Sequence, residues 1–239
     1  MIDLDRATAA LDRQAPEVVL EWAYRSFRRV AIVASFQAES SVVIHMAAGI
    51  VERPEVVTLD TGRLPEETFE VIDRIRRRYS IRLHVQTPDS QEVAEMVAAE
   101  GPNLFRYSTE LRHRCCEVRK VRPLTRALAG FDAWVTGVRR DQSESRRQTQ
   151  VVAMDGAHGG IAKVAPLAGW SRDQVWDYIH RNGLDYHSLY GRGYRSIGCA
   201  PCTRAVGPDE DERAGRWWWE ASTVKECGLH WAAAGSGSE

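Results

Sequence analysis

Short apolar runs alternate with amphipathic segments along most of the chain. The runs VAIVAS (30–35), VVTLDTG (56–62), IRLHV (81–85) and AWVTGV (133–138) predict four strands. In VAIVAS the apolar residues do not alternate with polar ones, which favours a strand buried in a parallel sheet. Two shorter strands at 151–153 and 161–164 flank DGAHGG and predict a hairpin at a sheet edge.

Helical segments are expected between these strands. They cover 7–13, 17–29, 41–50, the segment opened by Pro65, 87–101 and the segment from Ser171 through His180. Ser171 and Gln174 have the spacing of a capping box, which marks a helix start. A further short helix is expected at 209–220. Alternating strands and helices predict an α/β fold with a doubly wound, mostly parallel sheet in one domain.

Composition narrows the class of protein. The 239 residues carry a formal net charge of −1, with 44% hydrophobic and 27% charged residues, typical of a globular protein. A general nucleic-acid binder is usually more basic, so we expect no nucleic-acid partner. No apolar run is long enough to span a bilayer, and the N-terminal stretch lacks the apolar core of a secretory signal. We therefore expect a cytoplasmic protein without membrane association.

Five cysteines carry the most specific signal: Cys115, Cys116, Cys199, Cys202 and Cys227. The first two are adjacent in RHRCCEVRK, where cations would stabilise thiolates. Cys199 and Cys202 form a CxxC pair, which alone fits a redox dithiol, half a zinc ribbon or a cluster site. An adjacent pair is hard to fit on one zinc ion, because successive side chains diverge. Together the four thiols fit a [4Fe–4S] cluster better, and a buried pair beside an unrelated CxxC is the weaker alternative.

Two loops after predicted strands are candidates for anion binding. SFQAES follows the first strand, and its serines and helix N-terminus could bind a phosphate, although an ordinary serine-capped helix is the favoured interpretation of this motif taken alone. GVRRDQSESRR follows the fourth strand, and its arginines could clamp phosphate or sulfate unless they form a solvated loop. Near the C-terminus, KECGLH places Cys227 close to Lys225 and His230, which suits an activated thiol.

With these motifs assembled, the sequence resembles the assimilatory adenylylsulfate (APS) reductases, within the wider APS and 3′-phosphoadenylylsulfate (PAPS) reductase family. The resemblance rests, in order, on SFQAES, LDTGRLPEET, RHRCCEVRKVRPL, TGVRRDQSESRR, KVAPLAGWSRDQVWDYI, SIGCAPCTR and KECGLH. It implies a nucleotide-binding fold like that of the PP-loop ATP pyrophosphatases. It also implies one [4Fe–4S] cluster per subunit, held by Cys115, Cys116, Cys199 and Cys202. The PAPS reductases generally lack these four cysteines, so the resemblance implies APS as substrate.

The resemblance also implies a reaction and a set of site residues. Cys227 would attack the sulfur of APS, release AMP and carry an S-sulfocysteine, which thioredoxin would reduce to sulfite for cysteine biosynthesis. Lys120 and His230 join Cys227 in the catalytic set; Ser35, Gln37, Leu59, Thr61, Gly137, Arg147, Arg213 and Arg216 form the substrate-binding set. The family commonly has Gly or Ser where this chain has Gln37. We expect no thioredoxin-like domain of the kind fused in plant enzymes, and therefore a separate thioredoxin as the electron donor.

We expect residues 1–206 to form the nucleotide-binding domain with the iron–sulfur site. Residues 207–239 would then be a mobile C-terminal segment of the same domain, carrying the nucleophile. Rival interpretations are a PAPS reductase, a PP-loop enzyme that thiolates tRNA, and a zinc- or cluster-based redox sensor. The sequence leaves open whether the chain forms a homo-oligomer.

Overall fold

The computed structural model describes residues 2–220. Its α-helices are α1 (Leu4–Leu11), α2 (Pro16–Ser26), α3 (Ala38–Ile50), α4 (Glu66–Arg78), α5 (Ser90–Glu100), α6 (Thr109–Cys116), α7 (Arg122–Leu128) and α8 (Arg172–Asn182). Its strands are β1 (Val30–Val33), β2 (Glu55–Leu59), β3 (Arg82–Gln86), β4 (Ala133–Val135), β5 (Val152–Asp155) and β6 (Ile161–Val164). No helix among the described residues is long and apolar enough to cross a membrane.

The six strands form one sheet in the order β3-β2-β1-β4-β6-β5. All neighbouring pairs are parallel except β5 and β6, which form the antiparallel hairpin at the edge. The chain winds outward from β1 through β2 to β3 and then returns to β4 on the other side of β1. Because the connections diverge there, the carboxyl ends of β1 and β4 border the crevice where such sheets bind ligands.

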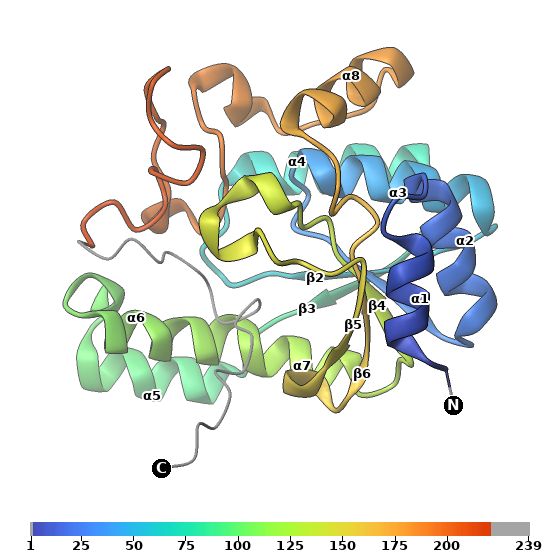
Figure 1. Ribbon diagram of the computed structural model, residues 1–239. Coiled ribbons are helices and arrows are strands. Elements are labelled where there is room, and N and C mark those ends of the chain that lie inside the picture. The colour runs from blue at the N-terminus through green and yellow to red at the C-terminus, as the bar shows by residue number, and fades with distance from the viewer. Residues whose placement is uncertain (1, 221–239) are drawn as a thin grey trace, which may run out of the picture.

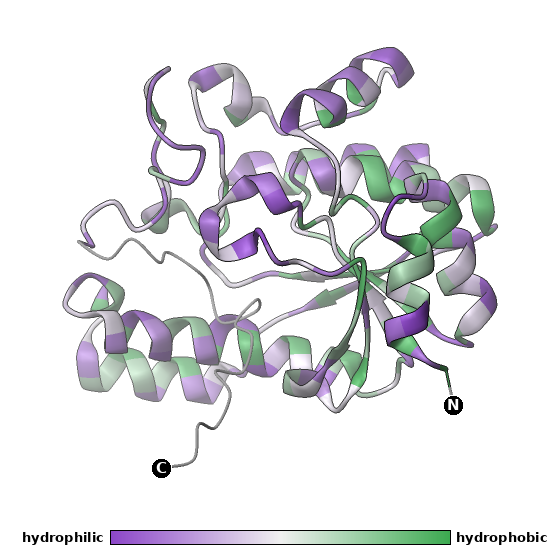
Figure 2. Cartoon of the chain, in the orientation of Figure 1, coloured by the Kyte–Doolittle hydropathy of each residue, from purple (hydrophilic) through white to green (hydrophobic). Residues whose placement is uncertain are grey.

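Helices cover both faces of the sheet (Figure 1). Helices α3, α4 and α8 lie on one side and α5, α6 and α7 on the other. Alternate strand residues point to opposite faces, so Ile32 and Val56 join the core beneath α3 while Ala31 and Val57 pack with Leu124 of α7. Burial on both faces explains the apolar runs, and the central strands are correspondingly hydrophobic in Figure 2.

The predicted strands and the helices α1 to α5 and α8 are confirmed, with ends that differ by a few residues, whereas α6 and α7 were not predicted. The structure also has the predicted capping box: Ser171 Oγ accepts from the backbone N–H of Gln174, whose side-chain oxygen accepts from the N–H of Ser171. The helix expected at 209–220 is wrong, because this stretch consists of turns and a bridge between Thr203 and Arg216. A Cβ at Gly215 would overlap the carbonyl of Arg204, so this glycine permits a close backbone approach that a helix there would not make.

Candidate functional site

A cavity of about 170 Å³ opens at the carboxyl ends of β1 and β4. Its walls include eight of the residues predicted to serve the site: Ser35, Gln37, Leu59, Thr61, Lys120, Gly137, Arg213 and Arg216. They come from the end of β2, from the loops after β1, β2 and β4, from the turn after α6 and from the C-terminal segment 207–220. The fold therefore gathers residues that are distant in sequence at the edge where α/β sheets bind nucleotides.

The loop after β1 is held in a tight conformation. Phe36 is fully buried and has a φ of 54°, which is unusual for a bulky residue. The next side chain, Gln37, donates to Ser35 Oγ at 3.0 Å and accepts from the backbone N–H of Ile197 at 2.7 Å. Gln37 thus ties the first loop to the segment leading into Cys199.

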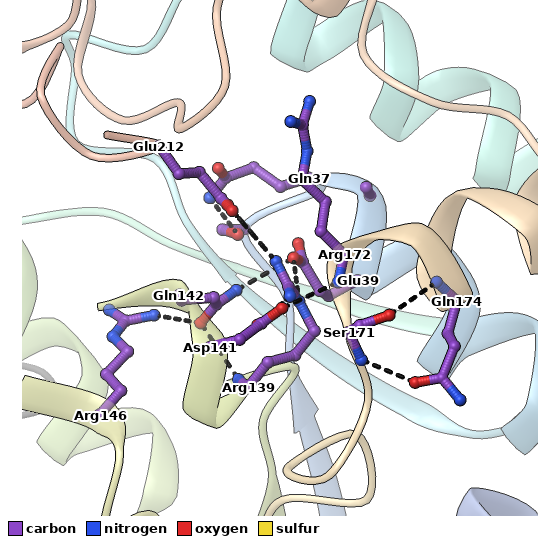
Figure 3. Close-up of polar contacts among 12 residues, drawn as sticks. Gln37, Glu39, Arg139, Asp141, Gln142, Arg146, Ser171, Arg172, Gln174 and Glu212 are labelled. Carbon is purple, nitrogen blue, oxygen red and sulfur yellow. Dashed lines mark hydrogen bonds and ion pairs between the residues drawn. The ribbon is translucent and has the colours of Figure 1, made fainter. Parts of the chain in front are cut away.

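The loop after β4 contains a buried arginine that is surrounded by acids. Gly137 packs closely on α3, since a Cβ there would lie 2.7 Å from the Cβ of Glu39. Arg139 is inaccessible to solvent and pairs with Glu39 at 3.0 Å, with Glu212 at 3.3 Å and with Asp141 (Figure 3). These contacts join the start of α3, the loop after β4 and the C-terminal segment into one wall of the cavity.

Arg147 does not line the cavity; its largely exposed side chain pairs with Glu144 at 2.8 Å. The neighbouring Arg146 does line it and donates to Gln142 Oε1 at 2.6 Å. Sequence reasoning identified this arginine-rich loop but chose the outer residue. Glu212 was missed altogether, because an acid in a charged segment gives no signal of burial.

A second, smaller cavity of about 20 Å³ is lined by all four predicted ligand cysteines. Cys115, Cys116, Cys199 and Cys202 are buried free thiols. Five cations also line this cavity: Arg63, Arg112, Arg119, Lys120 and Arg216. Such a surrounding would stabilise thiolates or a negatively charged group bound by them.

The adjacent cysteines end α6, and a π-helical turn follows at Glu117–Val121 before α7 begins. Wider π turns are rare and often occur at functional sites. The turn carries Arg119, which donates to the Thr61 carbonyl at 2.7 Å, and Lys120, which lines both cavities. It therefore connects the cysteine pair to the loop after β2.

Three residues connect the two cavities. Lys120 and Arg216 line both of them. Thr61, in the wall of the larger cavity, places its hydroxyl 3.3 Å from the sulfur of Cys199. An anion in the larger cavity would consequently lie close to the cations that surround the thiols.

The thiol pKa values respond to burial and to these cations in opposite directions. Burial raises the pKa of Cys115, and burial with the neighbouring Cys199 raises that of Cys202 to about 11. For Cys199, burial would raise the pKa, but Lys120, the hydrogen bond with Thr61 and Arg216 together lower it. Cys199 is thus the thiol most directly coupled to the anion-binding side of the site.

The donors that line the cysteine cavity match those that an iron–sulfur cluster uses. Within residues 2–220, no three His, Cys, Asp or Glu side chains are arranged to hold one metal ion. Four buried thiols around one cavity match the donor set of a cluster, whose ligands occupy separate corners. Trp217 also lines this cavity, and its buried indole N–H has no partner among the described residues. A sulfur of a bound cluster would be a suitable acceptor for it.

Trp217 itself lies between two guanidinium groups. Arg112 and Arg216 lie over its ring at 4.5 and 4.6 Å from the centroid, and its φ is 42°. Arg112 also pairs with Glu220 at 2.5 Å, near the end of the described chain. The predicted catalytic Cys227 and His230 lie outside the described residues, as does Lys225.

Comparison with known proteins agrees with this geometry. The model of the phosphoadenosine phosphosulfate reductase domain family matches residues 29–205. The chain belongs to this family. It is 46% identical over 202 residues to an adenosine 5′-phosphosulfate reductase of Burkholderia cepacia, covering 84% of this chain and 80% of that protein. A Pseudomonas aeruginosa (strain LESB58) protein of the same name is 42% identical over 233 residues, with 95% and 86% coverage.

A solved structure supports the same assignment of the fold. The phosphoadenylyl-sulfate (PAPS) reductase of Candida auris, in a phosphate complex, superposes with a TM-score of 0.72 at 26% identity. The match covers 85% of this chain and 96% of that one. The chain is therefore an enzyme of the reductase family with a PP-loop type of nucleotide-binding sheet, as the motifs implied.

Proposed function

We propose that this protein reduces adenosine 5′-phosphosulfate to sulfite and AMP in the cytoplasm, as a step of sulfate assimilation and cysteine biosynthesis, with thioredoxin as the electron donor. The observation that carries this proposal is the position of Lys120 and Arg216 in the walls of both cavities. The same two cations can bind a sulfate at the end of a nucleotide and offset the charge of a four-thiolate site. The names of the two bacterial relatives specify the same substrate.

The side chains that line the larger cavity suit both parts of the substrate, the adenosine and the phosphosulfate. The adenosine would be bound by the loop after β1, by the end of β2 with its following loop, and by the loop after β4. The residues concerned are Ser35, Gln37, Leu59, Thr61 and Gly137. Lys120, Arg213 and Arg216 would bind the phosphosulfate, since guanidinium and ammonium groups form charge-assisted hydrogen bonds with such oxygens. Arg146 is the better-placed arginine of the loop after β4, and Arg147 stays a prediction for a contact near the nucleotide.

The reaction transfers the sulfonate group from a phosphate oxygen of the substrate to the sulfur of Cys227. The thiolate of Cys227 attacks the sulfur of the substrate, the S–O bond to the phosphate breaks, and its electron pair leaves with AMP. A thioredoxin thiolate then attacks the Cys227 sulfur, expels sulfite and forms a mixed disulfide with Cys227. The second thioredoxin thiol attacks the thioredoxin sulfur of that bond, which closes the thioredoxin disulfide and releases the Cys227 thiolate. The donor dithiol thus supplies both electrons. His230 lies in the motif of the nucleophile.

Nucleophile and substrate are both anions, so repulsion between them is the barrier that the site has to lower. Lys120, Arg213 and Arg216 would do so by electrostatic stabilisation in a largely buried setting. Cys115, Cys116, Cys199 and Cys202 would hold a [4Fe–4S] cluster beside them. When bound, the cluster supplies a fixed charge that orients Lys120 and tunes the field near the sulfate.

The proposal is tested by measuring sulfite release with reduced thioredoxin, using APS and PAPS in parallel. We expect turnover of APS, much slower turnover of PAPS, and complete loss of sulfite release in the variant Cys227→Ser. This variant should retain the visible absorption of the iron–sulfur cluster. Sulfite release by Cys227→Ser would remove Cys227 from the nucleophile role, and faster turnover of PAPS would reassign the substrate.

The cofactor is tested separately, on anaerobically purified protein. We expect about four iron and four sulfide per chain, as the cluster type requires, with a brown absorption spectrum. Cys199→Ser should lose most of that absorption. An enzyme that is colourless and metal-free yet turns over APS at the full rate would refute the cluster assignment but leave the proposed reaction standing.

A further inference from the structure

Glu212 lies one residue before Arg213, on the C-terminal segment, and reaches across the cavity wall to the loop after β4. Both of its carboxylate oxygens accept from Arg139 Nη2, at 3.4 and 3.3 Å. Glu212 and Arg213 both line the larger cavity, and so does Arg216 four residues further along. The carboxylate thus forms one contact between the arginine-bearing segment and the wall of the cavity (Figure 3).

Arg139 is a fixed anchor for this contact. Its guanidinium is wholly buried and pairs with three carboxylates, those of Glu39, Asp141 and Glu212. Its backbone N–H donates to Gln142 Oε1 at 3.1 Å, and Gln142 in turn donates to Glu39 at 3.0 Å. Glu39 and Asp141 belong to the sheet-and-helix framework, whereas Glu212 is the member of this set contributed by the C-terminal segment.

We propose that Glu212 is a positioning residue that docks the segment 207–220 on Arg139 and thereby sets Arg213 and Arg216 at the anion-binding end of the cavity. This inference rests on the proposed function, in which these two arginines bind the phosphosulfate. Two further contacts hold Arg216 of this segment against residues 198–203. Its backbone bridges Thr203, and its guanidinium packs so closely on Gly198 that a Cβ there would overlap it.

Docking by Glu212 is linked to a proton. Burial, followed by the negative charge of Glu39, raises the pKa of Glu212 from 4.5 to about 7, although Arg139 opposes the rise. The other charged or titratable groups that act on it are Asp141 after β4, Arg172 of α8 and Tyr190. A carboxyl whose pKa is higher when docked binds a proton on docking, so docking weakens as pH rises from about 4.5 to about 7 and levels off above.

Two variants separate the role of the contact from that of the charge. Glu212→Gln keeps the hydrogen-bonding shape in a neutral form, and Glu212→Ala removes it. Asp209→Ala is the matched control, because Asp209 is an exposed acid of the same segment. ADP serves as the probe, since its 5′-diphosphate carries charge where the phosphosulfate would, and adenosine lacks that charge.

We expect Glu212→Ala to bind ADP about tenfold more weakly by calorimetry, with adenosine affinity within twofold of wild type. Hydrogen exchange of peptides within 207–220 should accelerate in the same variant, while Glu212→Gln and Asp209→Ala resemble wild type at pH 6. The ratio of ADP affinity in Glu212→Gln to that in wild type should rise at least threefold from pH 6 to pH 8, because docking weakens with pH only in wild type. The hydrogen-exchange protection of this segment should change in the same way. Comparing the two proteins at each pH cancels the ionisation of ADP itself.

Equal loss of ADP and adenosine affinity in Glu212→Ala would overturn the proposal, because Glu212 would then shape the nucleoside pocket. Unchanged exchange in segment 207–220, or a Glu212→Gln variant as weak as Glu212→Ala, would overturn it as well. None of these measurements depends on turnover. Failure to release sulfite from APS would therefore count against the proposed function alone.

Discussion

The hydroxyl of Thr61 lies 3.3 Å from the sulfur of Cys199, although 138 residues separate the two in sequence. Thr61 belongs to the loop after β2 and lines the nucleotide cavity, while Cys199 lines the cavity of the four thiols. The backbone carbonyl of Thr61 accepts a hydrogen bond from Arg119 of the π-helical turn, and Thr61 itself is buried. One threonine thus connects the proposed substrate site with the proposed cluster site.

Replacing Thr61 with Val should remove this hydrogen bond while keeping the side-chain volume. A hydrogen bond to a cluster ligand tunes the cluster, so we expect a shifted visible or electron paramagnetic resonance spectrum at unchanged iron content. The KM for APS should rise about threefold to tenfold, the cost of about one hydrogen bond. Thr61→Ser keeps the hydroxyl and should restore the spectrum; a Thr61→Val enzyme with the wild-type spectrum would disprove the connection.

Gly198 should be essential for the position of Arg216. A Cβ at residue 198 would overlap the Arg216 guanidinium, which the structure confines between Gly198 and Trp217. We expect Gly198→Ala to raise the KM for APS by about tenfold or more, because loss of one charge-assisted contact is worth roughly 1.5–3 kcal/mol. Steady-state kinetics on protein with full iron content checks this.

Gly49 provides the control for that substitution. It is exposed near the end of α3, and a Cβ there would meet nothing within 4 Å. Gly49→Ala should leave the KM unchanged and raise the free energy of unfolding by about 0.5–1 kcal/mol, since alanine favours helix. If both alanine variants impaired APS binding equally, crowding of Arg216 would not be the cause.

Arg139 should be critical for stability. Its removal leaves Glu39, Asp141 and Glu212 facing one another without the central cation, in a region where Arg139 is wholly buried. We expect Arg139→Met to lower the free energy of unfolding by about 3–5 kcal/mol, as for other broken buried ion pairs. Urea unfolding measures this, and adding Glu39→Gln should recover part of the loss. A single variant as stable as wild type would show that Arg139 is not the cation that holds this cluster together.

The sequence predicted the fold well where the signal is local. The strands at β1, β2 and β4 stand out because both of their faces are buried, and the capping box of α8 is formed by residues three positions apart. The helix expected at 209–220 failed because packing decides this stretch: Gly215 lies against Arg204, and Trp217 adopts a positive φ between two arginines. Such contacts depend on partners from other parts of the chain.

The same distinction applies to the site. The cysteines and the loops after the strands carry recognisable motifs, and the structure brings their residues to two adjoining cavities. Arg139 was expected to bind an anion with the other arginines of its loop, but the structure buries it and pairs it with acids instead. The role of Glu212 could not be predicted, because it looks like an ordinary charge in a polar segment. Only the fold shows that Arg139 is buried and that Glu212, from 73 residues away, is its partner.

His187 should make the fold sensitive to mild acid. It is buried, its Nδ1 accepts from the backbone N–H of Leu189, and its Nε2 therefore carries the proton and lies 3.0 Å from the Thr68 hydroxyl. Burial, and then the charge of Arg74, lower its pKa from 6.5 to about 4. A second proton would displace the Leu189 N–H, which explains the preference for the neutral ring.

A histidine whose pKa is lowered by folding stabilises the protein above pH 6.5, and that contribution is lost as the pH falls towards 4. We expect a loss of about 1–2 kcal/mol in the free energy of unfolding over this range, beyond the contribution of the carboxylates. Urea unfolding of wild type and His187→Gln at pH 7 and pH 5 isolates the contribution of His187 to the free energy of unfolding. The variant should be less stable at pH 7 but lose less on acidification, because glutamine does not titrate. Parallel losses in both proteins would show that His187 has an ordinary pKa and that other groups set the acid limit.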